Sequence, residues 1–125
     1  MTPTKSQKKE QLIIDVTMDE NMIPESIQWE SSQNKNTNHS ANAALIYFWN
    51  HSEQETFNLD LWTKKMSIEE MNKMMFQTFL TMANTYERAT NEDQIANAMR
   101  DFGEFFGEKT GVIPKSGKFE KNGEG

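Results

Sequence analysis

The sequence contains no cysteine, only two histidines and no glycine before residue 103. The absence of cysteine excludes disulfides, thiolate metal sites and cysteine nucleophiles, and it fits a reducing compartment. The six glycines lie at positions 103, 107, 111, 117, 123 and 125, and none of them opens a helix after a strand. The glycine-rich loops that cradle phosphates in nucleotide-binding proteins are therefore missing.

Basic residues and long apolar runs are also scarce. The net charge is −6, but between Glu10 and Ile113 seven Lys/Arg stand against seventeen Asp/Glu, which gives −10. Such a surface repels phosphate backbones, so we expect no nucleic-acid binding. The longest apolar run covers residues 43–49, far below the roughly 20 residues that span a bilayer. The basic, polar N-terminus has no apolar stretch typical of a signal peptide, and we expect a cytoplasmic protein.

The side chains that most often carry chemistry are isolated in this sequence. His39 and His51 both fall in predicted loops, and neither has a second metal ligand at helical spacing. Two acidic pairs, residues 19–20 and 92–93, suit a turn and the first turn of a helix, where a carboxylate favours the helix dipole. We therefore predict no catalytic residue, no metal site and no cofactor, and a protein that is not an enzyme.

The length of 125 residues suits one domain. Polar and turn-forming residues at both ends predict mobile segments over residues 1–9 and 114–125, with a single α+β domain over residues 10–113. Within it, four segments have the alternation or the residue types of β-strands. They are Gln11 to Thr17, Glu25 to Ser31, Asn42 to Asn50 and Glu55 to Trp62. The stretch from 33 to 40 is predicted to be a polar loop.

Two helices should follow the strands. Ser67 and Glu70 have the spacing of a capping box, and the helix that they begin should end near Ala89. Apolar residues then recur at helical spacing from Ile68 to Tyr86, and again from Ile95 to Phe106. The element order ββββαα predicts an α+β fold, with a four-stranded antiparallel sheet followed by two C-terminal helices.

An interface is predicted because the apolar surface exceeds what two helices could cover. The third strand is apolar on both faces, with Leu45, Tyr47 and Trp49 on one side and Ile46 and Phe48 on the other. Exposed apolar patches of this kind usually mark contact sites, and either face could be the uncovered one. The first helix is also rich in methionine, which suits adaptable binding surfaces. The candidate interface residues are Leu45, Tyr47, Trp49, Trp62, Met74, Phe76 and Leu80.

Several runs of this sequence resemble the GldC family of gliding motility proteins. The most specific are Asp60-Leu-Trp-Thr-Lys64 and Arg88-Ala-Thr-Asn91, and the similarity extends from about Gln11 to Gly111. The resemblance implies a cytoplasmic protein that supports surface motility, with a genetic link to the lipoprotein GldB and no known catalytic activity. It carries over no functional residues.

The molecular role has two competing interpretations. The first is a non-catalytic accessory protein that works through protein–protein contacts, forming a homo-oligomer or binding an unidentified partner in the gliding machinery. The second is a holdase chaperone for exported motility or secretion-system proteins. It rests on the element order ββββαα, which is similar to that of the tetrameric export chaperone SecB. Fold order alone does not establish function, so both interpretations stay open here.

Overall fold

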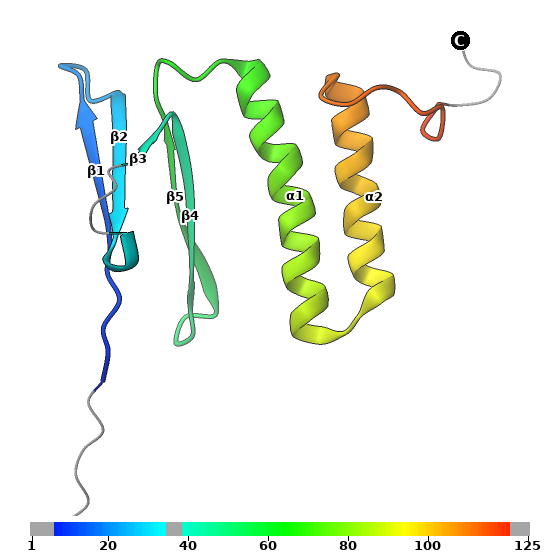
Figure 1. Cartoon of the computed structure of the whole chain (residues 1–125), viewed down its shortest axis with the longest axis horizontal. Coiled ribbons are helices and arrows are strands. Elements are labelled where there is room, and N and C mark those ends of the chain that lie inside the picture. The colour runs from blue at the N-terminus through cyan, green and yellow to red at the C-terminus, as the bar shows by residue number, and fades with distance from the viewer. Residues whose placement is uncertain (1–6, 35–38, 121–125) are drawn as a thin grey trace, which may run out of the picture. The chain divides into compact units, whose positions relative to one another are not determined.

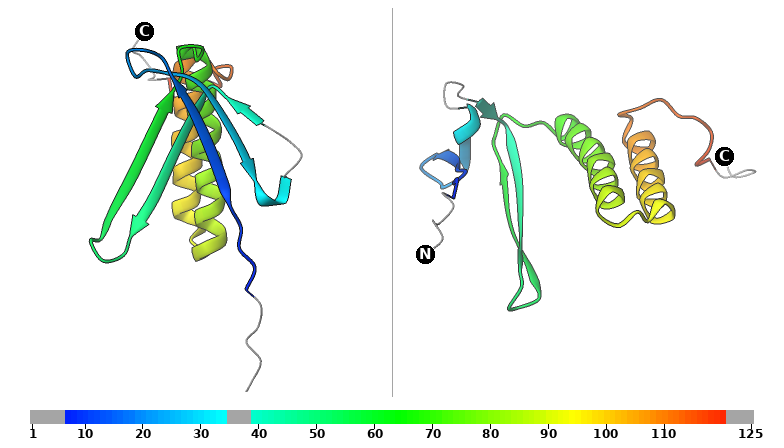
Figure 2. Two further views of the ribbon diagram at one scale, coloured as in Figure 1. Left: turned by 90° about the vertical axis from the view of Figure 1, so that its left-hand side faces the viewer. Right: turned by 60° about the horizontal axis from the view of Figure 1, so that its bottom comes forward.

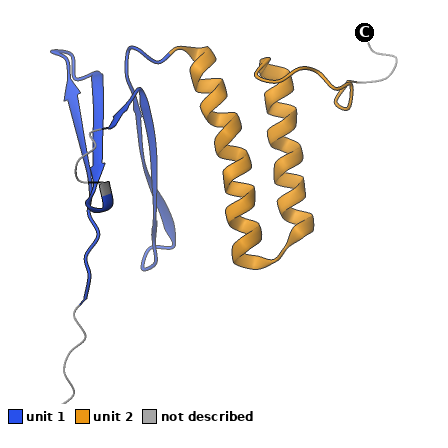
Figure 3. Cartoon of the chain, in the orientation of Figure 1, with its two compact units in different colours: residues 1–66 blue, residues 67–125 orange. Residues whose placement is uncertain are grey.

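The structure is a computed structural model of the chain, and it describes residues 7–34 and 39–120. Two compact units make up the chain, residues 1–66 and residues 67–125 (Figure 3). The described strands belong to the first unit and the two described α-helices to the second (Figure 1). The α+β class with two C-terminal helices is confirmed. The single domain expected over residues 10–113 stays a prediction.

The first unit contains two separate antiparallel sheets. A three-stranded sheet has the order β1 (Leu12–Met18), β2 (Pro24–Ser31) and β3 (His39–Ala41), with a short 3₁₀ helix, η1 (Ser32–Asn34), after β2. A two-stranded ribbon is formed by β4 (Ala43–Asn50) and β5 (Glu55–Trp62). Figure 2 shows the ribbon and the three-stranded sheet diverging from the point where the chain leaves β3.

The prediction of one four-stranded sheet is therefore wrong, and the reason lies at Asn42. Before this residue β3 pairs with β2, with Trp29 opposite His39, whereas after it β4 pairs with β5. The chain bends at Asn42 and exchanges its partner strand there. Alternating apolar residues mark a strand, but they do not say which strand lies beside it, because pairing depends on contacts distant in sequence. Part of the predicted loop from 33 to 40 is also strand, while residues 35–38 lie outside the described part of the chain.

The segment after β5 ties the two sheets of the first unit together. The backbone N–H and the hydroxyl of Thr63 both donate to the Asn42 carbonyl, at 2.9 and 2.8 Å, and Thr63 is buried. The Lys64 N–H donates to the Pro24 carbonyl at 3.3 Å, and the Lys64 ammonium pairs with Asp19 in the turn after β1. Two consecutive residues thus join the base of the ribbon to both ends of the β1–β2 turn.

The second unit is a pair of antiparallel helices, α1 (Ile68–Thr90) and α2 (Asp93–Thr110). The predicted capping box is present, because the Glu70 N–H donates to Ser67 Oγ at 3.1 Å and the Glu70 carboxylate accepts from the Ser67 N–H. Asn91 caps the C-terminal end of α1, and its left-handed backbone (φ 60°) reverses the chain. The Thr90 hydroxyl then accepts the Glu92 N–H at 3.1 Å, which takes the place of a side-chain cap on α2.

The seam between the helices combines residues of the predicted apolar stripes with small residues outside them. On α2 the buried residues Ala96, Gly103 and Gly107 share a face, and Gly103 and Gly107 approach Leu80 and Phe76 of α1. The Phe79 ring meets the rings of Phe102 and Phe106 edge-on, both at 5.2 Å between centroids, while Ile68, Met82, Ile95, Phe102 and Phe105 are exposed. Glycine carries no apolar signal, so the hydrophobic pattern does not show the part of the seam that Gly103 and Gly107 form.

Residues 114–120, at the start of the predicted C-terminal tail, contact α2. The Phe119 ring meets the Phe105 ring edge-on at 5.6 Å, and the Lys118 ammonium lies 3.0 Å from the Asp101 carboxylate. Both the N–H and the hydroxyl of Ser116 donate to the Glu108 carboxylate. Of the other predicted mobile residues, 7–9 are exposed and without regular structure, whereas 1–6 and 121–125 lie outside the described residues.

Candidate functional site

The pairing register of the β4–β5 ribbon divides its side chains into two faces. Residues directly opposite each other in an antiparallel pair point to the same side. Ala44 stands opposite Leu61, Ile46 opposite Leu59 and Phe48 opposite Phe57. We call this set the apolar face: Ala44, Ile46, Phe48, Phe57, Leu59 and Leu61. It carries no charged or polar side chain until the pair of Asn50 and Glu55 at the tip of the ribbon.

The other side of the ribbon combines large apolar residues on β4 with polar residues on β5. Leu45 stands opposite Asp60, Tyr47 opposite Asn58 and Trp49 opposite Thr56. We call this the mixed face: Ala43, Leu45, Tyr47, Trp49, Thr56, Asn58, Asp60 and Trp62. The Asn58 side-chain amide donates to Asp60 Oδ2 at 2.8 Å, as two neighbours on one face of a strand would.

Within the described part of the first unit, nothing covers either face of the ribbon beyond its base. On the apolar face Phe48 is 63% exposed, Phe57 48% and Leu59 52%. On the mixed face Tyr47 and Trp49 are each 61% exposed. A two-stranded ribbon on its own is marginally stable in water, and aromatic side chains left in water forgo the burial that would stabilise it. The ribbon is thus the part of the first unit that most needs a covering surface.

The candidate interface residues from the sequence fall at three places. Leu45, Tyr47, Trp49 and Trp62 all lie on the mixed face. Within that face the Trp62 indole N–H donates to the Met66 carbonyl at 2.9 Å, so this side chain also fixes the end of β5. Phe76 and Leu80 point at α2, where they pack against Gly107 and Gly103.

Met74 lines an open groove on the helical pair, with a volume of about 640 Å³. Met82 and Tyr86 of α1 and Met99 of α2 line the same groove. Methionine side chains adapt to ligands of irregular shape, so this groove is the second candidate contact surface.

Phe57 and Leu59 were missed as interface candidates. Their alternation along β5 was visible in the sequence, but the residue of β4 that stands opposite each of them was not. Only the register, which places Phe57 opposite Phe48, joins the two sets. The signal that could have found them is the combination of a hairpin turn at residues 51–54 with matched apolar positions on both arms.

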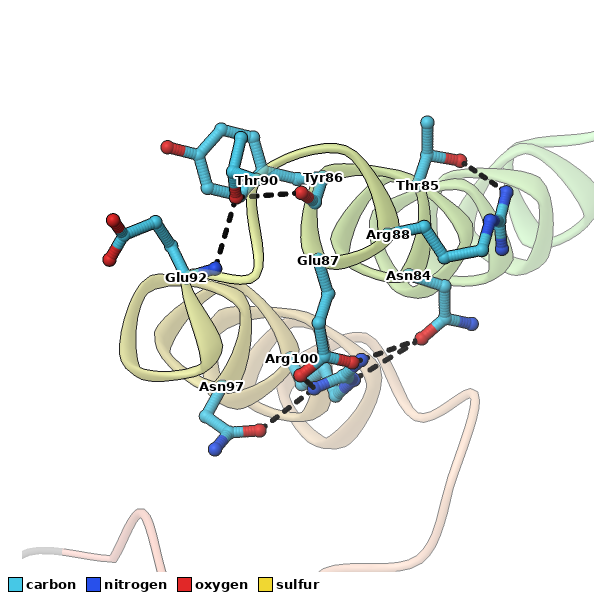
Figure 4. A network of polar contacts seen from close by, with 9 residues as sticks. All are labelled: Asn84, Thr85, Tyr86, Glu87, Arg88, Thr90, Glu92, Asn97 and Arg100. Atoms are coloured by element: carbon cyan, nitrogen blue, oxygen red, sulfur yellow. Dashed lines mark hydrogen bonds and ion pairs between the residues drawn. The ribbon is translucent and has the colours of Figure 1, made fainter.

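The densest polar cluster of the helical pair stabilises the seam. Figure 4 shows Arg100 of α2 reaching across to α1, where its guanidinium lies 2.6 Å from the Glu87 carboxylate and 2.9 Å from Asn84 Oδ1. Asn97 of α2 accepts a further bond from the same guanidinium at 2.8 Å. The hydrogen bond from Arg100 lowers the pKa of Glu87 and raises that of Arg100, so the pair is ionised at neutral pH. The hydrogen bonds of the Arg100 guanidinium all stay within the helical pair, which indicates a structural role.

The two histidines lie in different elements of the first unit. The His39 ring stacks on the Trp29 ring at 4.4 Å between centroids, across the β2–β3 pair, whereas His51 is exposed in the turn between β4 and β5. Among residues 7–34 and 39–120, no three His, Cys, Asp or Glu side chains gather closely enough to hold a metal ion. Asp19 has a lowered pKa, chiefly because the Lys64 ammonium donates to its carboxylate. The same carboxylate accepts the backbone N–H groups of Asn21 and Ile23, so it stabilises the turn between β1 and β2.

Neither α1 nor α2 combines the length and the apolar character needed to cross a bilayer. A family model described as gliding motility-associated protein GldC-like matches residues 24–112. The matched range runs from the first residue of β2 to just beyond α2, so it includes the ribbon and the helical pair. No curated protein and no solved structure matches the chain.

Proposed function

The chain belongs to the GldC-like family of gliding motility-associated proteins, and from this premise we propose that it supports gliding as a non-catalytic accessory protein that acts through protein–protein contacts. The single observation that carries the proposal is the β4–β5 ribbon, whose two faces both present exposed aromatic side chains. Tyrosine and tryptophan are enriched in interfaces, because they combine a large apolar area with a polar group. We place the protein in the cytoplasm, where it would contact a component of the gliding machinery.

The composition of the mixed face suits a partner that binds transiently. Its exposed Tyr47 and Trp49 offer apolar area, while Asn58, Asp60 and Thr56 next to them offer hydrogen-bonding groups. Interfaces between proteins that also exist apart have this composition, with aromatic anchors and a polar rim. The partner of the gliding machinery is therefore proposed to dock here.

The test is motility with a variant of the mixed face. In a gliding bacterium whose own copy is replaced, Tyr47→Ser combined with Trp49→Ser should abolish or strongly reduce colony spreading, at a protein level equal to the wild type. Gln28→Ser, an exposed change on β2, is the control and should spread normally. Full motility of the double variant would refute the proposed contact.

A holdase chaperone is the second candidate function, and the methionine-lined groove favours it. An apolar groove of about 640 Å³ with flexible lining residues would accept unfolded segments of many sequences. A stoichiometric amount of the protein should then suppress aggregation of a chemically unfolded client, and Met74→Asp with Met82→Asp should remove that effect. If the wild-type protein leaves aggregation unchanged, the holdase function is refuted and the accessory role is unaffected.

A further inference from the structure

The two faces of the β4–β5 ribbon differ in polarity, and each composition suits a different kind of binding partner. The apolar face consists of three stacked cross-strand pairs without a charge, whereas the mixed face has Asp60 and Asn58 in its centre. Obligate interfaces resemble a domain core cut in half, and interfaces between separable partners are more polar. The apolar face therefore calls for a permanent occupant.

A permanent occupant has to be present whenever the chain folds. The apolar face contributes to the stability of the ribbon itself, because a two-stranded ribbon without cover on either face is marginal. A partner from the motility machinery that binds transiently would leave Phe48 and Phe57 exposed to water whenever it is dissociated. A second copy of the chain is present at the same place and in the same amount, and a twofold axis would bring the same face from both copies together.

Charge also favours a second copy on this face. The chain carries a net charge of −6, so two copies repel each other wherever acidic side chains meet. On the apolar face no acidic side chain lies between Ala44 and Phe48 or between Phe57 and Leu61, and Glu55 stays at the tip. On the mixed face two copies would bring their Asp60 carboxylates together. Charge repulsion is thus absent when two copies meet through the apolar face, and it opposes self-association through the mixed face.

The area of the apolar face is extended at the base of the ribbon. Ala44 of the apolar face and Ala43 of the mixed face line a groove of about 290 Å³ with Leu12, Ile14 and Ile27 of the three-stranded sheet. Leu12 is 63% exposed, as is Phe48. If each large side chain presents about 200 Å² when fully exposed, then Leu12, Phe48, Phe57 and Leu59 contribute on the order of 450 Å² per copy. That is about half of the roughly 800 Å² that each partner buries in a standard interface, before any smaller neighbour is counted.

We propose that the apolar face of the β4–β5 ribbon, continued by the groove beside Leu12, is the surface on which a second copy of this chain docks. The mixed face then remains free for the motility partner. This assignment rests on the proposed function, since it divides the same ribbon between self-association and partner binding. The occupant of the apolar face is the chain itself, and the oligomer is the form that meets the partner.

The experiment compares two double variants that each remove two exposed aromatic side chains. Phe48→Ser with Phe57→Ser alters the apolar face, and Tyr47→Ser with Trp49→Ser alters the mixed face. Sedimentation of the wild-type protein should show a dimer or a larger species. The apolar-face variant should associate at least about tenfold more weakly, while the mixed-face variant should keep the wild-type mass. Circular dichroism checks that each variant is folded.

A second measurement keeps the proposal testable if the apolar-face variant does not fold. Because the chain has no cysteine, single cysteines report contacts cleanly. Leu59→Cys lies on the apolar face and Thr56→Cys on the mixed face, three residues apart on the same strand. Mild oxidation at low protein concentration should cross-link two copies through the first and not through the second.

Three outcomes would overturn the proposal. They are a wild-type protein that is monomeric at high concentration, an oligomer that only the mixed-face variant dissociates, and equal cross-linking at both positions. Failure here is distinguishable from failure of the proposed function. A monomer whose motility still depends on Tyr47 and Trp49 would refute self-association alone. An oligomer whose motility survives the mixed-face variant would refute the partner contact alone.

Discussion

Gly107 lies where α2 passes close to the Phe76 ring of α1. A Cβ atom at this position would stand 2.7 Å from two atoms of that ring and 3.0 Å from Ile113. These distances leave no room for a methyl group unless the helices move apart. The small residues on α2 therefore set how closely the two helices pack.

We predict that Gly107→Ala destabilises the protein by about 1–3 kcal/mol, because overpacking outweighs the gain in helix propensity of about 1 kcal/mol. Gly103→Ala is the matched control, since its Cβ would meet only the flexible end of Leu80 at 3.1 Å and the Phe79 Cβ at 3.4 Å. It should be close to neutral. Urea denaturation compares the two, and equal midpoints would contradict the close packing at Gly107.

Glu108 is a buried carboxylate whose charge is held by Ser116. The Ser116 N–H donates to it at 3.0 Å and the hydroxyl at 2.8 Å, and these bonds lower the pKa of Glu108. A carboxyl group with a lowered pKa in the folded state contributes stability above its ordinary value of 4.5. That contribution is lost as the pH falls through the lowered pKa.

We predict that Glu108→Gln is less stable than the wild type at neutral pH and that the difference shrinks as the pH falls below 4.5 and through the lowered pKa of Glu108. The measurement is the urea midpoint as a function of pH. Glu53→Gln, in the exposed turn between β4 and β5, is the control and should follow the wild type. A difference that stays constant over this range would mean that the ionisation of Glu108 does not contribute to stability.

At the scale of elements, α1 begins where its sequence predicts. Ser67→Ala removes the acceptor of the Glu70 N–H and should cost about 1 kcal/mol. Ser67→Asp is the control, because aspartate is an equally good N-cap and should keep the stability of the wild type. Chemical denaturation is the test. A Ser67→Ala midpoint equal to that of the wild type would show that the cap contributes nothing.

The two segments that carry most of the family resemblance both form joints between elements. In Asp60-Leu-Trp-Thr-Lys64, Thr63 and Lys64 tie the ribbon to Asn42, Pro24 and Asp19. In Arg88-Ala-Thr-Asn91, the Thr90 hydroxyl and the left-handed Asn91 make the turn from α1 to α2. The contacts of these residues hold the two joints together, so a structural role accounts for their presence.

At the scale of the whole molecule, the C-terminal tail contributes stability without forming the fold. Deleting residues 115–125 removes the donors of Glu108 and the ring contact of Phe105, so the melting temperature should fall while unfolding stays cooperative. Deleting only 121–125 is the control, since the contacts of residues 114–120 remain. Thermal unfolding followed by circular dichroism measures both. Loss of the cooperative transition in the longer deletion would mean that the tail is part of the core.

The acidic charge of the molecule predicts how salt acts on self-association. Two copies with a net charge of −6 repel each other over distances that salt screens, so raising the ionic strength from about 20 mM to about 300 mM should tighten the oligomer severalfold. Sedimentation at the two salt concentrations is the measurement. Weaker association at high salt would indicate that attraction between opposite charges, and not apolar contact, holds the copies together.

Local chemistry determined a large part of this protein from the sequence alone. The capping box at Ser67, the helix end predicted near Ala89 and found at Thr90, and the alternation along β5 all depend on residues within a few positions of one another. Their pattern is therefore visible in the sequence. The acidic charge and the runs that resemble the family are likewise properties of the chain itself. The family membership and the α+β class with two C-terminal helices followed from these.

Only the tertiary structure decided which distant residues share a surface. The change of partner strand at Asn42, the register that joins Phe57 to Phe48, and the seam at Gly103 and Gly107 all depend on contacts between residues far apart in sequence. An alternating strand fits several partners, and a glycine gives no apolar signal, so one sequence is compatible with several such arrangements. The division of the ribbon into an apolar and a mixed face exists only once β4 and β5 are paired, because pairing selects which side chains stand side by side.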